Sequence, residues 1–519
     1  MKKRIILGSL LTMLVLAGAG IVLIATQAEP RLRDWVVTTL SKSMKSEVEL
    51  GAVHLNWMPL KLEAQNLTVR HRGRTDVPPL LVVKSFAVDL ELTDLWNRST
   101  IEHVVVDGLE INFPPKDPVT GKRPLPDAPA APGGASDTNG STGVILKRLT
   151  ATNSRMAIIP REDWKEPKVW DIIQLEMTNL RSQEAASFTA TLTNPIPKGT
   201  IETTGSFGPW QSDEPGDTPI AGDYTFAADL GTIEGLEGDL SAVGKMDGTI
   251  DQIKTTGQTR TQNFRLTELN GDTLPLTTAY EALVDGTKGD VELRRVDVHL
   301  GKSEFITKGV VQGTKGVKGK RIVLNVKSSN ANLGELLRFA SKTAEPPAHG
   351  RLRIDTAFDL RQGKQPILSR LELEGSVRAE RVTFTNDVVQ EKIDVLSRKA
   401  QGRPADASID EVASEVATKF WLRNGEFTYQ GLSFAVQGAD VRLAGTHSLR
   451  SKSLNLAGEV LLKATVSQTM TGYKSWLLKP FDPLFKKNGA GTRLAIRVQG
   501  TQDQPKVGLE IGKTLRGSD

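Results

Sequence analysis

The sequence predicts a mainly β protein with one N-terminal transmembrane helix and a few short covering helices. Of its 519 residues only 5% are aromatic, while 47 are glycine. From about residue 47 onward, apolar and charged residues alternate with a period of two, and Asn-Gly or Asp-Gly pairs separate these runs. This combination is typical of antiparallel strands that are joined by tight turns and wetted on one side only.

The first predicted element is a membrane anchor over residues 1–28. Basic residues at positions 2–4 precede an uncharged run over residues 5–24. A helix rises about 1.5 Å per residue, so this run can span the ~30 Å hydrocarbon core, and its basic start should stay in the cytoplasm. A cleaved signal peptide is the alternative because Ala17 and Ala19 fit a cleavage pattern, but the apolar part of such peptides is only ~7–15 residues long. Both alternatives export the remainder of the chain.

The strands follow the anchor in three regions, which we place at 29–113, 144–385 and 420–519. In the segment 351–360, for example, Ile354 and Phe358 alternate with charged residues. Roughly twenty such strands are expected, mostly in antiparallel hairpins. Ten residues illustrate the apolar side of these strands: Phe86, Val88, Leu90, Leu92, Leu324, Val326, Ile354, Phe358, Leu456 and Ile496.

Three segments interrupt the strand pattern. Residues 114–143 are rich in Pro, Ala, Gly and Ser, which predicts a disordered loop. Residues 332–342 predict a short helix that Asn332 caps. Residues 386–419 predict a helical insertion that covers an edge or an end of the sheet. It contains two helical patterns around a break at 402–404: Ile393 and Leu396, then Ile409, Val412 and Val416.

A sheet of this size must hide its apolar side, because open twisted sheets rarely exceed ~10 strands. It can split into packed sandwiches, close into barrels, or curl into a gutter whose apolar lining is covered by acyl chains. The low aromatic content is mild evidence against sandwiches, since bulky side chains usually fill the ~10 Å between two sheets. The pattern alone leaves these architectures open.

Both ends of the chain resemble the AsmA-like family, which is related to the TamB and YhdP envelope proteins. The N-terminal match is SEVELGAVHLNWMPLKLEAQNLTV over residues 46–69, followed by the closing pattern Asp107-Gly108-Leu109. The C-terminal matches are QEKIDVLSRKAQG over 390–402 and GTRLAIRVQGTQDQPKVGLEI over 491–511. The middle of the chain resembles the family only in its strand-rich composition.

The resemblance implies an elongated, twisted antiparallel sheet curled into a hydrophobic groove, with residues 144–385 as its central part and the ten apolar residues named above as illustrative members of its lining. It also implies a single-pass protein of the cell inner membrane, anchored through residues 5–24, with the bulk of the chain in the periplasm. Such a protein would hold or transfer phospholipids and support outer-membrane homeostasis, with the outer membrane or an envelope protein as a further partner. The alternative is an exported, membrane-tethered β-sandwich scaffold or adhesion protein without lipid cargo.

A basic, aromatic segment over residues 474–487 is a candidate for contact with a membrane surface. Trp476, Phe481 and Phe485 lie there among four lysines. Such segments rest on anionic membranes through their rings and their charge. The alternative is that the segment packs as a lid at the end of the sheet.

Catalysis, cofactors and metals are not expected. The chain has no cysteine, its six histidines lack the spacing of a metal helix, and no phosphate-loop or nucleophile-elbow motif is present. His103 and His299 fall in predicted strands, where a solvated or hydrogen-bonded role is expected. A paired-carboxylate hydrolase stays open because such sites leave little trace in sequence. The net charge of +5 is spread along the chain, which disfavours a nucleic-acid partner.

Overall fold

The computed structural model confirms a mainly β protein. It describes residues 33–34, 37–38, 41, 47–57, 60–70, 75, 78–89, 100–113, 145–159, 168–181, 184–209, 217–269, 271–286, 289–314, 317, 319–471, 474–475, 479, 482, 491–501 and 504–510. Strands make up 66% of this part and belong to a mixed sheet of 25 strands that is not closed. The chain divides into an N-terminal unit (residues 1–234, 239–259 and 281–291) and a C-terminal unit (235–238, 260–280 and 292–519).

The N-terminal unit contains the first strands of the chain. They are β1 (Glu47–Glu49), β2 (Val53–Trp57), β3 (Leu60–Arg70), β4 (Leu81–Asp89), β5 (Thr100–Phe113), β6 (Ile145–Ile158), β7 (Lys168–Leu180), β8 (Ala186–Pro195), β9 (Lys198–Phe207), β10 (Pro219–Asp229), the 3-10 turn η3 (Leu230–Thr232) and β12 (Asp239–Thr249). The strands β13 (Gln252–Leu266), β14 (Leu274–Val284) and β15 (Val291–Leu300) have residues in both units.

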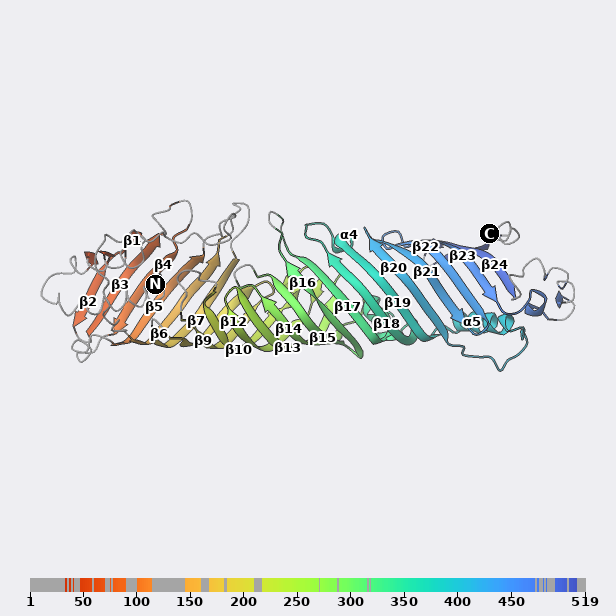
Figure 1. Ribbon diagram of the computed structural model, residues 1–519, viewed down its shortest axis with the longest axis horizontal. Helices are drawn as coiled ribbons and strands as arrows, with labels where there is room; N and C mark the ends of the chain where they lie inside the picture. Colours follow the sequence, from red (N-terminus) through yellow and green to blue (C-terminus); the bar gives the residue numbers. More distant parts are fainter. Residues whose placement is uncertain are drawn as a thin grey trace. The chain divides into compact units, whose positions relative to one another are not determined.

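The C-terminal unit contains the later strands and several helices. Its elements are β11 (Leu236–Glu237), β16 (Ser303–Gln312), β17 (Arg321–Asn332), α3 (Leu333–Ala340), β18 (Ala348–Leu360), α4 (Ile367–Arg370), β19 (Leu371–Phe384), α5 (Asp387–Ala400), β20 (Ser414–Arg423), β21 (Glu426–Val436), β22 (Ala439–Ser448), β23 (Ser453–Leu462), η4 (Ser467–Thr469), β24 (Thr492–Thr501) and β25 (Pro505–Leu509). Within this unit, β17 to β24 follow one another side by side (Figure 1).

A parallel strand pair in the described part of the chain departs from the predicted antiparallel pattern. The strands β5 and β6 are parallel, with Thr100 opposite Ile145 and Phe113 opposite Ile158. Parallel neighbours need a crossover of a dozen or more residues. The predicted loop over 114–143 lies between these strands in sequence and is long enough for the crossover, although its residues lie outside the described part. The sheet is therefore mixed rather than purely antiparallel.

The N-terminal unit has a continuous buried core. It comprises 23 described residues on strands β1 to β8 and the segments beside them, and it includes Val69, Val88, Val104 and Leu146, which are 0% exposed. Phe86, which is 5% exposed, belongs to the same core. Many of the alternating apolar side chains of β1 to β8 are thus covered by protein.

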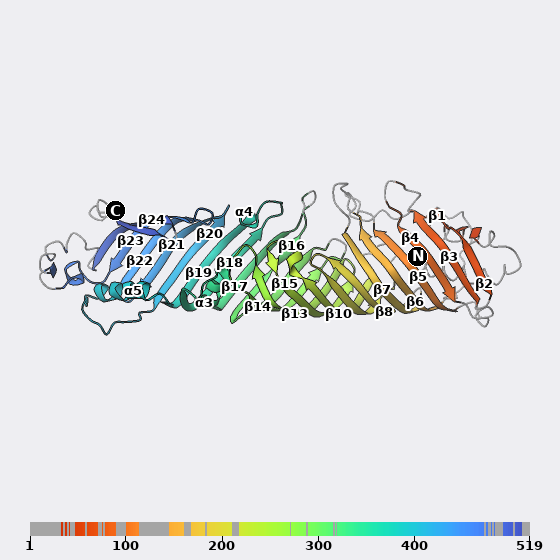
Figure 2. The same ribbon diagram turned by 180° about the vertical axis from the view of Figure 1, so that it is seen from behind.

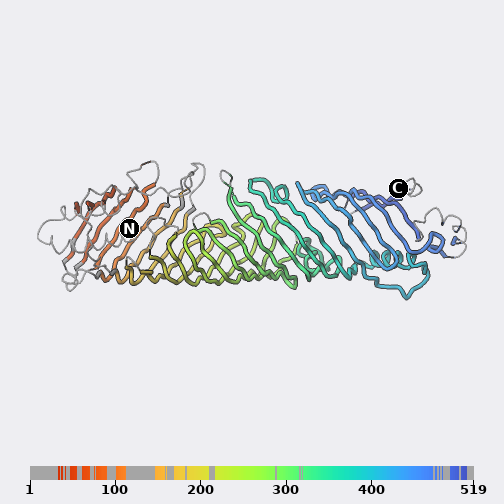
Figure 3. The backbone as a smooth tube through the Cα atoms, viewed as in Figure 1, coloured from red at the N-terminus to blue at the C-terminus, as the bar shows by residue number. Residues whose placement is uncertain are grey.

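The C-terminal unit buries side chains mainly beneath its two longer helices. One cluster of five buried residues packs against Leu333, Leu336 and Leu337 of α3, and a cluster of four includes Ile393 and Ala400 of α5. Both helices lie at one end of the strands, and α4 lies at the other (Figure 2). Figure 3 follows the same strands as a backbone trace, coloured from green to blue along this part of the chain. The expectation of short covering helices is confirmed for α3 and α5.

One of the two predicted helical regions agrees with the structure, and the other agrees only in part. Asn332 caps α3 as predicted, since its side chain accepts a hydrogen bond from the amide of Glu335. The second helix of the 386–419 insertion was predicted wrongly: residues 401–413 form turns, and β20 begins at Ser414. Val412 and Val416 fit a helical spacing, but the segment 414–422 alternates with a period of two, and β-branched residues favour strands.

The predicted anchor over residues 5–24 lies outside the described residues. Within the described ranges, the chain has no helix of the length and apolarity that crossing a membrane requires.

Candidate functional site

Strands β16 to β24 separate their side chains into two chemically distinct faces. Successive strand residues point to opposite faces, and residues opposite one another on neighbouring strands share a face. Leu324 lies opposite Phe358, Phe358 opposite Leu373, and Leu373 opposite Leu422. We call the surface that contains this row the apolar face. Its other members include Val311, Ile322, Val326, Ile354, Val377, Phe420, Phe427, Tyr429, Leu443, Leu454, Leu456, Ile496 and Val498.

The apolar face is only partly covered. Leu324, Val326, Ile354 and Phe358 are half-buried rather than buried. Leu456 and Ile496 are 6% and 7% exposed. On β25, the neighbouring Val507 and Leu509 are 68% and 60% exposed, although they lie opposite Val498 and Ile496 of the same face. In the described part of the C-terminal unit, the two buried hydrophobic clusters are small, and they lie beneath α3 and α5.

The opposite face carries charge pairs that join adjacent strands, and we call it the polar face. Lys327 Nζ lies 2.9 Å from Asp355 Oδ2, and Arg361 lies 2.7 Å from Glu372. The Arg321 guanidinium hydrogen-bonds Asp359 and holds the pKa of that carboxyl below its ordinary value. Exposed pairs of this kind contribute at most about 1 kcal/mol each. These pairs identify the side of the strands that faces water.

Aromatic rings form a group on the apolar face of β20, β21 and β22. The ring of Phe427 lies 5.8 Å from Phe420, 5.7 Å from Tyr429 and 6.4 Å from His447. The Tyr429 hydroxyl lies 3.4 Å from Nδ1 of His447, and burial raises the pKa of Tyr429. Sequence analysis did not predict this group, because its members come from three strands and only the strand register brings them together.

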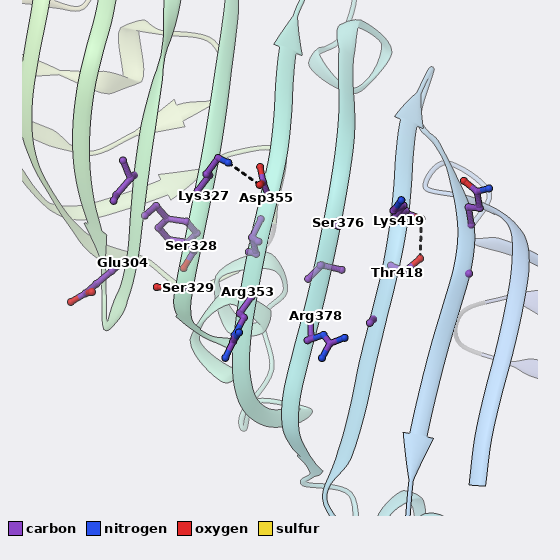
Figure 4. A pocket seen from close by; sticks show the side chains of 17 residues that line it. Glu304, Lys327, Ser328, Ser329, Arg353, Asp355, Ser376, Arg378, Thr418 and Lys419 are labelled. Carbon is purple, nitrogen blue, oxygen red and sulfur yellow. Dashed lines mark hydrogen bonds and ion pairs between the residues drawn. The ribbon is translucent and has the colours of Figure 1, made fainter. Parts of the chain in front are cut away.

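A hollow of about 830 Å³ lies on the C-terminal unit over β16 to β21. It is lined by exposed side chains of the polar face together with residues of the alternate strand positions, such as Ile354 and Val377. Figure 4 shows Lys327 joined to Asp355 on the next strand, with Arg353 and Arg378 on neighbouring strands below them.

Three carboxylate side chains form a group with the spacing that a metal ion would require. Among the described residues, Glu391, Asp394 and Asp410 place ligand atoms within 4.8 Å of one another. Asp394 is 1% exposed and accepts hydrogen bonds from Gln390 and from the amides of Val412 and Glu411.

These hydrogen bonds give Asp394 a role in the fold. Burial acts to raise the pKa of Asp394, but hydrogen bonds from the Val412 amide, Gln390, Asp410 and the Glu411 amide outweigh it and lower the pKa. The carboxylate therefore fastens the turns after α5 to the helix. The central carboxylate of this acidic group already accepts hydrogen bonds from the protein, so the group gives no indication of a metal site.

The structure brings four of the predicted lining residues together and leaves others apart. Leu324 and Val326 of β17 share the apolar face with Ile354 and Phe358 of β18. Leu456 and Ile496 lie on the same face further along the strand order, whereas Phe86 and Val88 lie in the core of the N-terminal unit. The remaining predicted residues lie outside the described ranges: Leu90, Leu92, Trp476, Phe481 and Phe485.

The two histidines predicted in strands occupy β5 and β15. His103 Nε2 lies 3.0 Å from Thr150 Oγ1, and its Nδ1 lies 3.3 Å from Asp89. His299 Nδ1 lies 3.9 Å from Glu304. The hydrogen-bonded role predicted for these residues is thus observed for His103.

Comparison with protein-family models, with curated proteins and with solved structures found no match to this chain. The resemblance to the AsmA-like family therefore stays a prediction that the quoted sequence motifs carry.

Proposed function

We propose that this protein holds or transfers phospholipids through contact between their acyl chains and the apolar face. The observation that carries the proposal is the row of Leu324, Phe358 and Leu373 over β17 to β19, whose side chains are half-buried and belong to neither of the two buried clusters described in the C-terminal unit. Contiguous apolar surface that stays partly open to solvent is typical of a binding surface.

The chemistry of the apolar face suits a mobile lipid. Each acyl methylene removed from water contributes about 0.8 kcal/mol without directional preference. The interior of a bilayer is also hydrocarbon, so movement of a chain from the bilayer to this face is close to neutral in free energy. A lipid could then load and leave without being trapped, while its headgroup stays in water.

The proposal includes the predicted cellular setting. The segment 5–24 would anchor the protein in the inner membrane, the strands would curl into a groove in the periplasm, and the lipid would serve outer-membrane homeostasis. The quoted sequence motifs and the uncharged N-terminal run support this part of the proposal.

Site-specific photocrosslinking tests the lipid contact. A benzophenone amino acid replaces Phe358 on the apolar face or, as a matched control, Ala357, which is the neighbouring residue of β18 on the polar face. After irradiation of cells and purification of the full chain, we expect phospholipid adducts in the mass spectrum of the Phe358 variant and none in that of the Ala357 variant.

Two outcomes would contradict the proposal. Equal adduct yields from the two positions would mean that lipid contact does not depend on the apolar face. Absence of adducts from both positions, in protein that unfolds at the wild-type temperature and carries no co-purifying phospholipid, would favour the scaffold or adhesion alternative.

A further inference from the structure

The hollow over β16 to β21 carries an excess of positive charge. Its lining contains the cations Lys327, Arg353, Arg378 and Lys419 but only two carboxylates, those of Glu304 and Asp355. All four cationic residues are exposed. The excess charge lies on the polar face, although Ile354 and Val377 of the apolar face also line the hollow.

Two arginines of this hollow lie directly opposite each other. Arg353 of β18 is the register partner of Arg378 of β19. Side chains in such positions have Cβ atoms about 5 Å apart, and like charges there destabilise the sheet. On the same strands Asp359 lies opposite Glu372, but each of these carboxylates has an ion pair, with Arg321 and Arg361 respectively. An arginine pair therefore needs a compensating anion.

Protein groups compensate this charge only in part. Arg353 Nε lies 3.4 Å from Glu380, and Lys327 lies 2.9 Å from Asp355. Arg378 and Lys419, by contrast, have no ion pair with any residue in the described ranges. Of the two carboxylates in the lining, Asp355 pairs with Lys327, and Glu304 lies 3.9 Å from His299, which is charged only when protonated. The two charges without an ion pair, those of Arg378 and Lys419, thus lie on the neighbouring strands β19 and β20 and line the same hollow.

Irregular strand pairing occurs where the hollow lies. The pairing of β17 with β18 shifts between Ser328 and Ala331, that of β20 with β21 shifts between Ala417 and Lys419, and Gly431 of β21 has a φ of 69°. Bulges bend strands and redirect side chains. The hollow therefore coincides with interruptions of the regular ladder.

We propose that this hollow binds a phosphate-bearing anion through Arg378, Arg353 and Lys419. A guanidinium offers a planar fork of donors that matches phosphate oxygens, and an ammonium adds a point charge. The Ser376 hydroxyl, which also lines the hollow and lies opposite Lys419, is a further donor. The anion is either a free phosphate or the phosphate of a lipid headgroup. The proposal is independent of the apolar face.

Calorimetric titration of the full chain in a neutral detergent tests this site. The two probes are inorganic phosphate and glycerophosphoglycerol, a headgroup diester without acyl chains, so neither reports on the apolar face. We expect saturable binding of at least one probe with a Kd below about 1 mM at low salt. Binding of phosphate alone assigns a free phosphate, and binding of the diester assigns a lipid headgroup.

The double variant Arg378→Gln, Lys419→Gln should bind the same probe at least about tenfold more weakly, because it loses two charge-assisted contacts. The matched control is Arg423→Gln, an exposed arginine of the same strand as Lys419 that does not line the hollow, and it should bind like wild type. Unchanged thermal unfolding shows that the variants fold. The proposal is overturned if wild type binds neither probe, if the double variant binds normally, or if the control weakens equally.

Discussion

Strands β1 to β8 of the N-terminal unit and β17 to β19 of the C-terminal unit both alternate apolar and polar side chains, but they cover the apolar ones to different extents. In the N-terminal unit, Val88 is 0% exposed within a core of 23 described residues. In the C-terminal unit, Phe358 has the same alternating context and is only half-buried. The comparison teaches that strand alternation identifies the apolar side of a sheet but not what covers it.

The functional proposals follow this difference. A residue in a packed core has little surface to offer a ligand, whereas a half-buried row has surface left to cover. The predicted lining residues of the C-terminal unit therefore carry the lipid proposal, and Phe86 and Val88 do not contribute to it. The charge pattern of the polar face adds a second, chemically different surface on the same strands.

The largest expected effect comes from a matched pair of core and face truncations. Leu62→Ala in the N-terminal core, where Leu62 is 1% exposed, should destabilise its unit by about 2–5 kcal/mol because it leaves a cavity. Leu324→Ala on the apolar face removes a side chain that is already partly solvated and should cost about 1 kcal/mol. Hydrogen exchange of the β3 and β17 amides measures each effect locally. Equal losses would show that the two units are packed alike.

An intermediate effect is expected where α5 holds the turns that follow it. Asp394→Ala removes the acceptor of the Val412 amide and one of the two acceptors of the Glu411 amide, which should cost about 1–3 kcal/mol and speed exchange in α5.

The same residue predicts a pH dependence. The folded pKa of Asp394 is lowered, so its contribution is fully present above the ordinary value of about 3.9 and is lost as the pH falls through the lowered folded value. Acid titration of α5 exchange should show this loss in wild type and not in Asp394→Ala. An unchanged acid profile in the variant would contradict the assignment.

The smallest effect is expected at the cap of α3. Asn332→Ala removes the acceptor for the Glu335 amide and should destabilise the helix by about 1 kcal/mol. Asn332→Asp, which keeps the acceptor, is the control. The cluster beneath α3 packs against this helix. Amide exchange at Leu352 should therefore rise in Asn332→Ala and not in Asn332→Asp. Exchange that stays slow in both would show that the strands bury this cluster without the helix.

Local features were predictable because short-range physics determines them. The alternation over 351–360 predicted a strand, and β18 covers Ala348–Leu360. Asn424-Gly425 predicted a tight hairpin, and these residues have φ angles of 51° and 75° between β20 and β21. Asn332 predicted a cap because its side chain reaches an amide only three residues away.

The sequence by itself thus determined the strands, their turns, the capped helix and the chemistry of each strand face, since each depends on residues close together in the chain. Only the tertiary structure decided that β5 and β6 pair in parallel, that Val88 is enclosed while Phe358 is half-buried, and that Arg353 lies opposite Arg378. These outcomes depend on which distant strands meet and in which register. A periodic pattern is the same for every register that keeps the apolar side chains on one face.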